Sequence, residues 1–522
     1  MTVMRRWDFA VALDQNRELP VFLQLASAIA DDIRSGRLKR GDALPGTREL
    51  AESLGVNRNT IVAGYEELAA EGLVQTRVGG GTYVAEPIVR ALSPTTVRLL
   101  DADAPTFEVD EPSCPAPVAL DAPPGMLMLS LGLPDARLFP SRALARAFRR
   151  ALGQRQRALL SYADPSGHVR LRTQLAAMLV RTRGLPVSAD NVMVTRSIEQ
   201  AIDLVARLLL KPGDAVAVEA FGFPPAWSVL RLAGARLVPV PIDRQGFDVA
   251  AFETLLARER FRAVFLTPHH QFPTGSVMST ARRSRLAELA SVHNFAILED
   301  DYDHEFHYAG KPVLPIAAGP GRGNVIYMGS LSNLLSPGVT SAFVAARPEV
   351  FQHLLRLRAA SDSRGDAAME CAVAELFEDG ELLRHMRRMR KTYASRRDAL
   401  AAALRHHLAG ALDFRLPEGG TAIWARAAPD IDVSSWATAG LREGVLFADS
   451  SRYDFHGRDA SFVRLGYSYH DELELAEAVR RMARALMRVR APRIGARPRA
   501  EASGLERAAA AAARPAIALR SS

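Results

Sequence analysis

Titratable side chains gather directly after two apolar segments of this 522-residue sequence, residues 262–267 and 295–300. The side chains in question are His269, His270, Asp301, Asp303, His304 and His307. Imidazole and carboxylate groups are the usual ligands of zinc and related metal ions. Their spacing here matches no familiar zinc motif, however, and acidic strand ends often carry surface histidines. We therefore expect no metal site at these residues.

The composition is that of an ordinary globular protein, with 48% hydrophobic and 24% charged residues. It excludes a wholly disordered, collagen-like or coiled-coil chain. No apolar run is long enough to cross a bilayer, so no membrane-spanning segment is expected. The first residues lack an apolar stretch of signal-peptide length, which predicts a cytoplasmic protein. The two cysteines, Cys114 and Cys371, cannot make a disulfide framework.

Proline marks the main boundary in the chain. Residues 87–125 hold eight prolines and no lasting periodicity, which predicts a semi-extended linker between an N-terminal module (17–86) and a large body (126–490). The tail, 491–522, carries six Arg and two Glu and is expected to be disordered. Although the whole chain has a net charge of +8, residues 20–86 hold seven basic and nine acidic side chains. Any DNA binding by the module must therefore depend on where its charges lie.

The N-terminal module is predicted to contain three helices followed by a β-hairpin. Apolar residues recur at helical spacing in the first and third helices. We expect the short second helix to be capped by Thr47 and to end at Gly55. Two alternating segments, 73–78 and 82–84, flank the glycine turn at 79–81. This order is the layout of a winged helix-turn-helix.

Several motifs of this module resemble those of the GntR family of bacterial transcription regulators. They are Gly36-Arg-Leu-Lys-Arg-Gly-Asp-Ala-Leu-Pro, Arg48-Glu-Leu-Ala, Asn57-Arg-Asn-Thr, Glu71-Gly-Leu-Val and Gly79-Gly-Gly-Thr-Tyr-Val. The resemblance implies double-stranded DNA as the partner. It also implies phosphate and base contacts from Arg48 and Arg58, a recognition helix that begins at Asn57, Asn59 and Thr60, and a wing at Gly79 and Gly80. These roles are physically reasonable, because a helix N-terminus attracts phosphate and Arg can bind guanine through two hydrogen bonds.

The body alternates apolar strands with helices. Strands are expected at 191–195, 215–219, 262–267, 295–300 and 324–330. Continuous apolar strands separated by helices predict an α/β fold with a mostly parallel sheet covered on both faces. Functional residues are then expected where the strands end. A separate, small α+β subdomain is expected over about 370–490.

The polar residues at these strand ends resemble those of the fold-type I, pyridoxal-phosphate-dependent aminotransferases. The similar stretches are Tyr162-Ala-Asp-Pro-Ser-Gly, Thr267-Pro-His-His-Gln-Phe-Pro-Thr-Gly, Glu299-Asp-Asp-Tyr-Asp, Gly329-Ser-Leu-Ser and Val463-Arg-Leu-Gly-Tyr. The whole chain thus resembles the MocR subfamily, in which a GntR head is fused to an aminotransferase-like body. The resemblance implies that Asp300 faces the pyridine nitrogen of pyridoxal phosphate, Tyr302 its ring hydroxyl, and Arg464 a substrate-type carboxylate. It also assigns Phe223 and Ser330 to the cofactor site.

One position departs from this family in a way that changes the chemistry. In the family, Gly-Ser-Phe-Ser is followed by the lysine that forms the Schiff base, whereas here Gly329-Ser-Leu-Ser is followed by Asn333. An amide nitrogen can neither condense with the aldehyde nor carry the proton that the lysine transfers. The four lysines of the chain, at 39, 211, 311 and 391, do not follow a buried strand with the expected serine.

Two further departures affect the phosphate. Thr340 stands where the family has an arginine, and the phosphate-binding Gly-Ser-Gln reads Ser197-Ile-Glu. Ile198 removes a hydroxyl donor, and Glu199 places an anion beside a dianionic group. Each lost charge-assisted hydrogen bond costs roughly 1.5–3 kcal/mol. Pyridoxal phosphate is therefore predicted to bind weakly, non-covalently or not at all.

Together these observations predict a DNA-binding transcription regulator whose aminotransferase-like body is catalytically degenerate and acts in dimerisation and effector sensing. A homodimer is expected because paired heads match paired half-sites. The expected effector is a small carboxylate at Arg464 or a vitamer; no membrane partner is expected, and the DNA-bound protein would be nucleoid-associated. Two alternatives stay open: an active aminotransferase with an appended DNA-binding head, and a nucleic-acid-binding scaffold that uses the basic tail.

Overall fold

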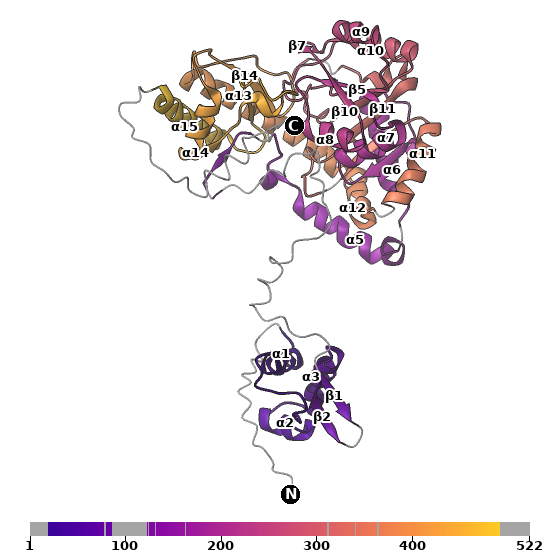
Figure 1. The fold of residues 1–522 in the computed structure, drawn as a ribbon, viewed down its shortest axis with the longest axis vertical. Coiled ribbons are helices and arrows are strands. Elements are labelled where there is room, and N and C mark those ends of the chain that lie inside the picture. Colours follow the sequence, from indigo (N-terminus) through magenta and orange to yellow (C-terminus); the bar gives the residue numbers. More distant parts are fainter. Residues whose placement is uncertain are drawn as a thin grey trace, which may run out of the picture. The chain divides into compact units, whose positions relative to one another are not determined.

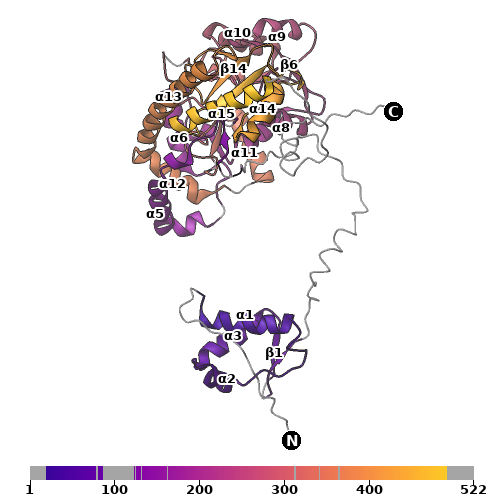
Figure 2. The ribbon, with the colours of Figure 1, turned by 90° about the vertical axis from the view of Figure 1, so that its left-hand side faces the viewer.

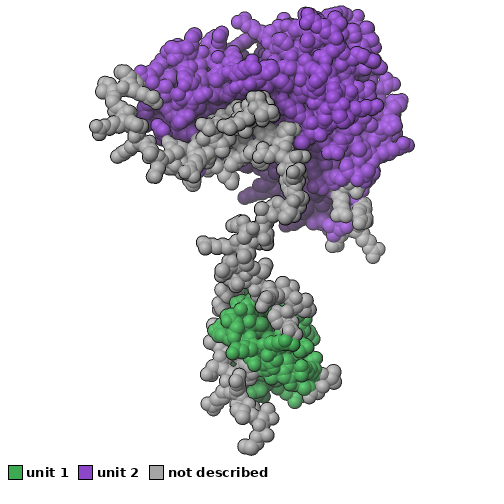
Figure 3. Space-filling view, viewed as in Figure 1, with its two compact units in different colours: residues 1–111 green, residues 112–522 purple. Residues whose placement is uncertain are grey.

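The structure is a computed structural model that divides into two compact units, residues 1–111 and 112–522 (Figure 3). It describes residues 19–77, 80–85, 123, 125–130, 132–161, 163–310, 313–339, 341–362 and 365–490. Most of the predicted linker, the whole tail, Gly79, Tyr162, Lys311 and Thr340 lie outside the described residues.

The N-terminal unit is the predicted winged helix-turn-helix (Figure 1). Its elements are α1 (Val21–Arg34), α2 (Thr47–Leu54), α3 (Arg58–Ala70), and the antiparallel strands β1 (Val74–Arg77) and β2 (Gly81–Val84). A small core of apolar side chains from every element, including Ile29, Leu50, Ile61, Leu68 and Val84, holds them together.

The cap predicted for the second helix is wrong. Thr47 is the first residue of α2, the N-cap is Gly46, and no side chain caps this end. Instead, the Thr47 hydroxyl accepts a hydrogen bond from Arg58 Nε, 3.3 Å away. The predicted end of the helix is confirmed, because Gly55 takes the left-handed conformation, with φ of 65°, that favours glycine after a helix.

A seven-stranded sheet forms the centre of the C-terminal unit (Figure 1). In sheet order its strands are β4 (Val192–Thr195), β12 (Ala342–Ala345), β11 (Val325–Ser330), β10 (Ala296–Asp301), β9 (Ala263–Leu266), β5 (Ala215–Glu219) and β6 (Arg236–Val240). Strand β12 is antiparallel to both of its neighbours, and the other pairs are parallel. The predicted α/β fold with a mostly parallel sheet is confirmed; β6 and β12 were not predicted.

Helices cover both faces of this sheet. On one face Val216, Phe265 and Leu298 pack with residues of α7 (Ile198–Leu209), α8 (Pro224–Leu232) and α11 (Pro348–Ser361). Their sequence neighbours, such as Ala217, Val264 and Ile297, face the larger core on the opposite side. The helices on that side and around it are α5 (Ser141–Leu159), α6 (Val169–Arg183), α9 (Val249–Leu256), α10 (Thr280–His293) and α12 (Ala367–Glu378).

The predicted α+β subdomain follows α12. A three-stranded antiparallel sheet, β13 (Leu412–Phe414), β14 (Ala422–Ala427) and β16 (Phe462–Gly466), packs with α13 (Glu381–His407), α14 (Val433–Arg442) and α15 (Glu472–Arg490). Helices α13 and α15 lie side by side (Figures 1 and 2).

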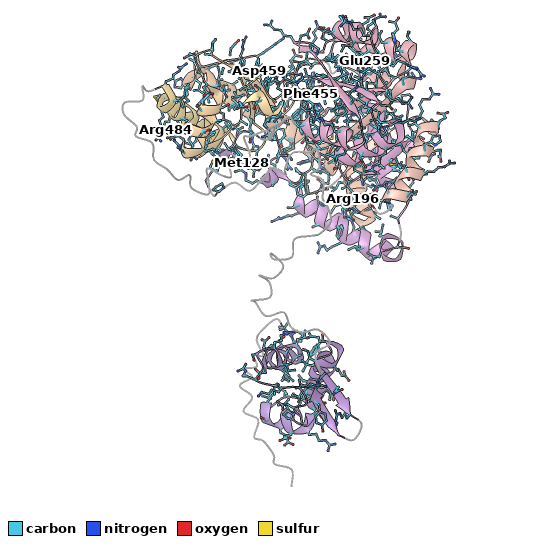
Figure 4. The ribbon with its side chains drawn as sticks, viewed as in Figure 1. Met128, Arg196, Glu259, Phe455, Asp459 and Arg484 are labelled. Atoms are coloured by element: carbon cyan, nitrogen blue, oxygen red, sulfur yellow. The ribbon has the colours of Figure 1, made fainter. Side chains whose placement is uncertain are left out.

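The first strand of the body also joins this subdomain, which was not predicted. Strand β3 (Leu127–Met128) pairs in parallel with β15 (Val445–Leu446). The backbone N–H of Met128, labelled in Figure 4, donates to His470 Nε2 at 2.9 Å. The remaining short elements are β7 (Ile242–Asp243), β8 (Gly246–Phe247) and the 3-10 turns at Ala136–Leu138, Ala189–Asn191, Ile316–Ala318, Arg322–Asn324 and Ser450–Arg452. Among the described helices, none is both long and apolar enough to cross a bilayer.

Candidate DNA interface and ligand site

The N-terminus of α3 presents the predicted DNA-contacting residues to solvent. Asn57 is the N-cap, and its side chain accepts a hydrogen bond from the backbone N–H of Asn59 at 2.9 Å. Asn57, Arg58 and Asn59 are exposed, and Thr60 is half-buried. Arg48, on α2, is also exposed. The free N–H groups and the positive end of the helix dipole make such a terminus suited to a phosphate.

The hairpin supplies a further cation that the sequence analysis missed. Arg77, at the end of β1, lies with its guanidinium carbon 5.0 Å from the centre of the Tyr83 ring. The Tyr83 hydroxyl donates to the carbonyl of Gly80 at 2.6 Å, which holds the described part of the turn against β2. Arg77 directly precedes the glycine-rich turn, and this position in the sequence could have drawn attention to it.

In the body, parallel strands bring the predicted cofactor residues to one edge of the sheet. Asp300 is paired in register with Met328, and Asp301 with Gly329, so Ser330 at the end of β11 lies near Tyr302 just beyond β10. The Ser330 hydroxyl accepts a hydrogen bond from the backbone N–H of Ser332 at 3.0 Å. Strand ends thus position these side chains, as the sequence predicted.

Asp300 is buried with an unsatisfied carboxylate oxygen. Only 2% of the residue is exposed, and Oδ1 has no hydrogen-bond partner among the described residues. Burial, followed by the charges of Asp301 and Glu199, raises the pKa of Asp300 well above its usual range. A cationic or proton-donating ligand group at this place would relieve an unfavourable burial.

Phe272 brings three of the predicted residues together. Its ring contacts Phe223, at 5.4 Å between centroids, and Tyr302, at 6.1 Å, both edge to face. The guanidinium carbon of Arg464 lies 4.8 Å from the centre of the same ring. Phe272 was not singled out from the sequence, although it lies inside the stretch from Thr267 to Gly275 that carries the family likeness.

Arg464 has a free guanidinium edge within the described residues. The side chain, on β16, is 5% exposed, and its Nε has no hydrogen-bond partner there. Gly132 leaves the necessary space, because a Cβ atom at this glycine would lie 2.7 Å from Arg464 Nη2 and 2.6 Å from Thr421 Oγ1. A buried cation of this kind is suited to a carboxylate, which it can bind through two hydrogen bonds.

Asn333 lies beside the strand end that carries Asp300. Its side-chain amide donates to the backbone carbonyl of Tyr302 at 3.2 Å. The residue predicted to replace the Schiff-base lysine is therefore within reach of the same strand end, and it presents an amide. Lys211 and Lys391 are exposed on the surface of the body, and Lys39 is exposed in the N-terminal unit.

The start of α7 is the predicted phosphate-binding turn. Ser197 is the N-cap, and its hydroxyl accepts from the backbone N–H of Gln200 at 3.3 Å. Glu199 lies in the first turn, close enough to Asp300 for its charge to raise the pKa of that carboxyl. Arg196, labelled in Figure 4, precedes the cap and forms an ion pair with Asp362 at 3.6 Å. The turn therefore combines a helix dipole that favours an anion with a carboxylate that opposes one.

Although acidic strand ends often carry surface histidines, three of the histidines after β9 and β10 are not exposed. His269, His270 and His304 are buried, with 2%, 1% and 7% exposed. The strand ends lie beneath the α+β subdomain rather than at an open edge, as an isolated bridge between His307 and Gly419 illustrates. The long-range packing that covers these residues left no signal in their local sequence.

Comparison with known proteins identifies both parts of the chain. A family model for aminotransferase class I and II matches residues 126–486, and a model for bacterial regulatory proteins of the gntR family matches residues 23–84. Among solved structures, the alpha-aminoadipate aminotransferase LysN from Thermus thermophilus, complexed with N-(5'-phosphopyridoxyl)-L-leucine, is similar with a TM-score of 0.66 and 30% identity, over 70% of this chain and 93% of that chain. The class is thus an aminotransferase-like body with a GntR-type DNA-binding head.

Relatives that span the whole chain narrow this class. The probable rhizopine catabolism regulatory protein MocR of Rhizobium meliloti is 31% identical over 90% of this chain and 94% of its own length. The pyridoxine biosynthesis transcriptional regulator PdxR of Corynebacterium glutamicum is 28% identical over 89% of this chain and 96% of its own length. The chain belongs to the MocR subfamily of GntR-type transcription regulators, and the aminotransferase family that its body joins is one that binds pyridoxal phosphate.

Proposed function

We propose that this regulator binds operator DNA as a homodimer and that its body senses a small carboxylate-bearing molecule without aminotransferase chemistry. The head reads the DNA through α3 and the wing, and the body acts as dimerisation and effector domain. The observation that carries the proposal is the amide of Asn333 at the place of the Schiff-base amine.

The residues that would face the cofactor ring and the residue that would face its aldehyde support different conclusions. On the ring side, the unsatisfied oxygen of Asp300 and the rings of Tyr302 and Phe223 suit a flat, protonated heterocycle. On the covalent side, an amide cannot form an imine, because its nitrogen lone pair is delocalised into the carbonyl. The residues present therefore do not suit covalently bound pyridoxal phosphate.

The phosphate side adds to this mismatch. A dianionic phosphate at the start of α7 would meet the carboxylate of Glu199 and would lack the hydroxyl that Ile198 replaces. Like charges repel, and the repulsion is stronger where water is excluded. We therefore propose that any vitamer binds weakly and without a covalent bond.

Arg464 is the proposed recognition group for the effector. Its guanidinium is buried, faces the space kept open by Gly132 and lies over Phe272. LysN, the similar solved structure, holds a phosphopyridoxyl derivative of leucine, and leucine is an amino acid with a carboxylate. An amino acid or another small carboxylate is accordingly the effector class that we propose for this chain.

In the head, we propose that Arg58 and Arg48 contact bases and phosphates, that Asn57, Asn59 and Thr60 place the N-terminus of α3 against the DNA, and that Gly79 and Gly80 form the wing contact. The exposed positions of Arg48 and Arg58 support this proposal. A dimer is proposed because a pair of heads matches the two half-sites of an operator.

Adding pyridoxal phosphate to the purified full-length protein tests the proposal that the body carries out no aminotransferase chemistry. We expect no aldimine absorption band, and no adduct inside the cleft after borohydride reduction, proteolysis and mass spectrometry. Low labelling of the exposed Lys211 and Lys391 measures non-specific reaction. A stoichiometric adduct at a single one of the four lysines, or an absorption change that depends on an added amino acid, would instead support an active aminotransferase with an appended head.

A further inference from the structure

Four histidines form a cluster just beyond the ends of β9 and β10. The ring centroids of His269 and His270 are 4.4 Å apart, as are those of His269 and His304. His307 completes the group, with its ring nearly parallel to that of His270 at 6.2 Å.

Five ring nitrogens of this cluster are buried without a hydrogen-bond partner among the described residues. They are both nitrogens of His269, both nitrogens of His307, and Nε2 of His270. Buried polar atoms are nearly always paired, and each one left unpaired costs free energy. Such a concentration of unpaired acceptors and donors in one place indicates a group that satisfies them together.

We propose that His269, His270 and His307 bind one divalent transition-metal ion, such as Zn²⁺ or Ni²⁺. One ligand atom from each of these residues lies within 4.8 Å of the other two. Tetrahedral zinc with bonds of about 2.0–2.1 Å to nitrogen holds its ligand atoms about 3.4 Å apart. The rings need to move inward by less than about 1 Å to close on an ion of this size. Imidazole nitrogen is a preferred ligand of zinc and nickel.

The surroundings of the three rings are those of a metal site. Nδ1 of His270 bonds to Asp303 Oδ1 at 2.7 Å, which fixes the ring and leaves Nε2 for the ion. A carboxylate behind a ligand histidine is the common outer-shell arrangement and strengthens the ligand.

Gly419 keeps the coordinating edge of His270 accessible. A Cβ atom at this glycine would lie 2.2 Å from His270 Nε2, far inside van der Waals contact. Of the three histidines, His307 is half-buried, whereas His269 and His270 are buried.

A second set of three residues, His269, Asp301 and His304, also brings ligand atoms together. Its carboxylate is already engaged, because Asp301 Oδ2 accepts from the Tyr327 hydroxyl at 2.5 Å and bonds to His304 Nδ1 at 2.8 Å. Metal binding there would compete with existing bonds, whereas binding by His269, His270 and His307 preserves the bond between His270 and Asp303. The three-histidine set is therefore the proposed site.

Metal titration of the full-length protein tests the proposal. After removal of metal with a chelator and dialysis, we expect one equivalent of Zn²⁺ per chain by competition with a chromophoric chelator. Co²⁺ in the same site should give the visible d–d absorption of a nitrogen-ligated ion. His307→Ala should weaken Zn²⁺ binding at least tenfold, and Asp303→Asn should weaken it by roughly 10- to 100-fold.

Two matched variants separate this site from adventitious binding. His406 and His407 are adjacent, exposed histidines at the end of α13, so the double variant His406→Ala/His407→Ala should keep the full stoichiometry and affinity. His304→Asn should keep binding within a few-fold. Circular dichroism verifies that each variant is folded. If substitution of a buried histidine prevents folding, the half-buried His307 still provides a testable variant.

Three results would overturn the proposal: no stoichiometric binding by the native protein, native affinity in His307→Ala, or loss of binding in His304→Asn with retention in His307→Ala. The test is independent of the proposed effector function, because none of its readouts involves pyridoxal phosphate or DNA.

Discussion

The residues predicted to be functional are mostly exposed in the head of this regulator and buried or half-buried in its body. In the head, Arg58 and its neighbours are exposed at the start of α3, and a local hydrogen bond from Asn59 to the Asn57 side chain sets the geometry. In the body, Asp300 and Arg464 are buried on strands of two different sheets, and long-range packing places Arg464 over Phe272, whose ring also contacts Tyr302.

This difference affects how strongly the loss of one residue changes the function of each region. A DNA contact depends on charge and shape over several exposed side chains, and loss of one weakens binding without abolishing it. Imine chemistry depends on one amine, which no neighbouring group can replace. Under the proposed function, Asn333 removes imine chemistry from the body, whereas the fold of that body is similar to that of an aminotransferase.

Restoring the amine is the change with the largest expected effect. In Asn333→Lys we expect pyridoxal phosphate to give an aldimine absorption band and a borohydride-trapped adduct at position 333, which the native chain lacks. Adding Ile198→Ser and Glu199→Gln should then tighten binding by roughly 10- to 150-fold, because a charge-assisted hydrogen bond is worth about 1.5–3 kcal/mol. Spectrophotometric titration and peptide mapping measure both effects.

Labelling of Lys211 and Lys391 in the same samples gives an internal control, since both are exposed. If the triple variant Asn333→Lys/Ile198→Ser/Glu199→Gln also forms no adduct, the site differs from a pyridoxal-phosphate site at more than these three positions. The proposed loss of cofactor chemistry in the body would then involve more residues than we propose.

The sequence predicted the head well because its signals are local. The glycine that ends α2, the cap of α3 and the glycine-rich turn each determine the backbone within a few residues. The exception was Thr47, whose hydroxyl bonds to Arg58 eleven positions away instead of capping its own helix.

In the body, the strands and the residues that follow them could also be predicted, since buried parallel strands are continuous apolar runs. What lies over the strand ends could not. Phe272 gains its role from contacts with Phe223 and Arg464, and the histidines are buried by a subdomain formed more than a hundred residues later. No periodicity in the sequence reports such packing.

Removing one cation from the head should have a graded effect. We expect Arg58→Ala to weaken binding to an operator by roughly 5- to 150-fold, that is 1–3 kcal/mol, and to relax sequence preference. Operator fragments can be selected from genomic DNA with the native protein, and fluorescence anisotropy at fixed salt gives the affinities. Arg207→Ala is the matched control, because Arg207 is an exposed arginine of the body that pairs with Asp203. Equal affinities of the Arg58 variant and the native protein would show that the exposed arginine is only part of a solvated surface.

The body and the head also differ in how many carboxylates they bury. The body buries several, including Glu219, whereas the described part of the head buries none. Burial raises the pKa of Glu219 to about 8 from its ordinary value of 4.5. Between these two pH values the folded body holds a proton that the unfolded chain has lost, so this carboxyl lowers stability as pH rises, by about 1 kcal/mol per pH unit.

Glu219→Gln should remove this share of the pH dependence. A glutamine oxygen can still accept the two hydrogen bonds from Thr267, its backbone N–H and its hydroxyl, at 3.2 and 2.9 Å. Compared between pH 5.5 and 7.5, the free energy of unfolding of the native body should fall by about 2 kcal/mol more than that of the variant. Urea unfolding followed by tryptophan fluorescence reports mainly on the body, which contains Trp227, Trp424 and Trp436. Glu349→Gln, at an exposed position of α11, should leave the native slope unchanged; if Glu219→Gln does so too, Glu219 ionises in the folded body as it does in the unfolded chain.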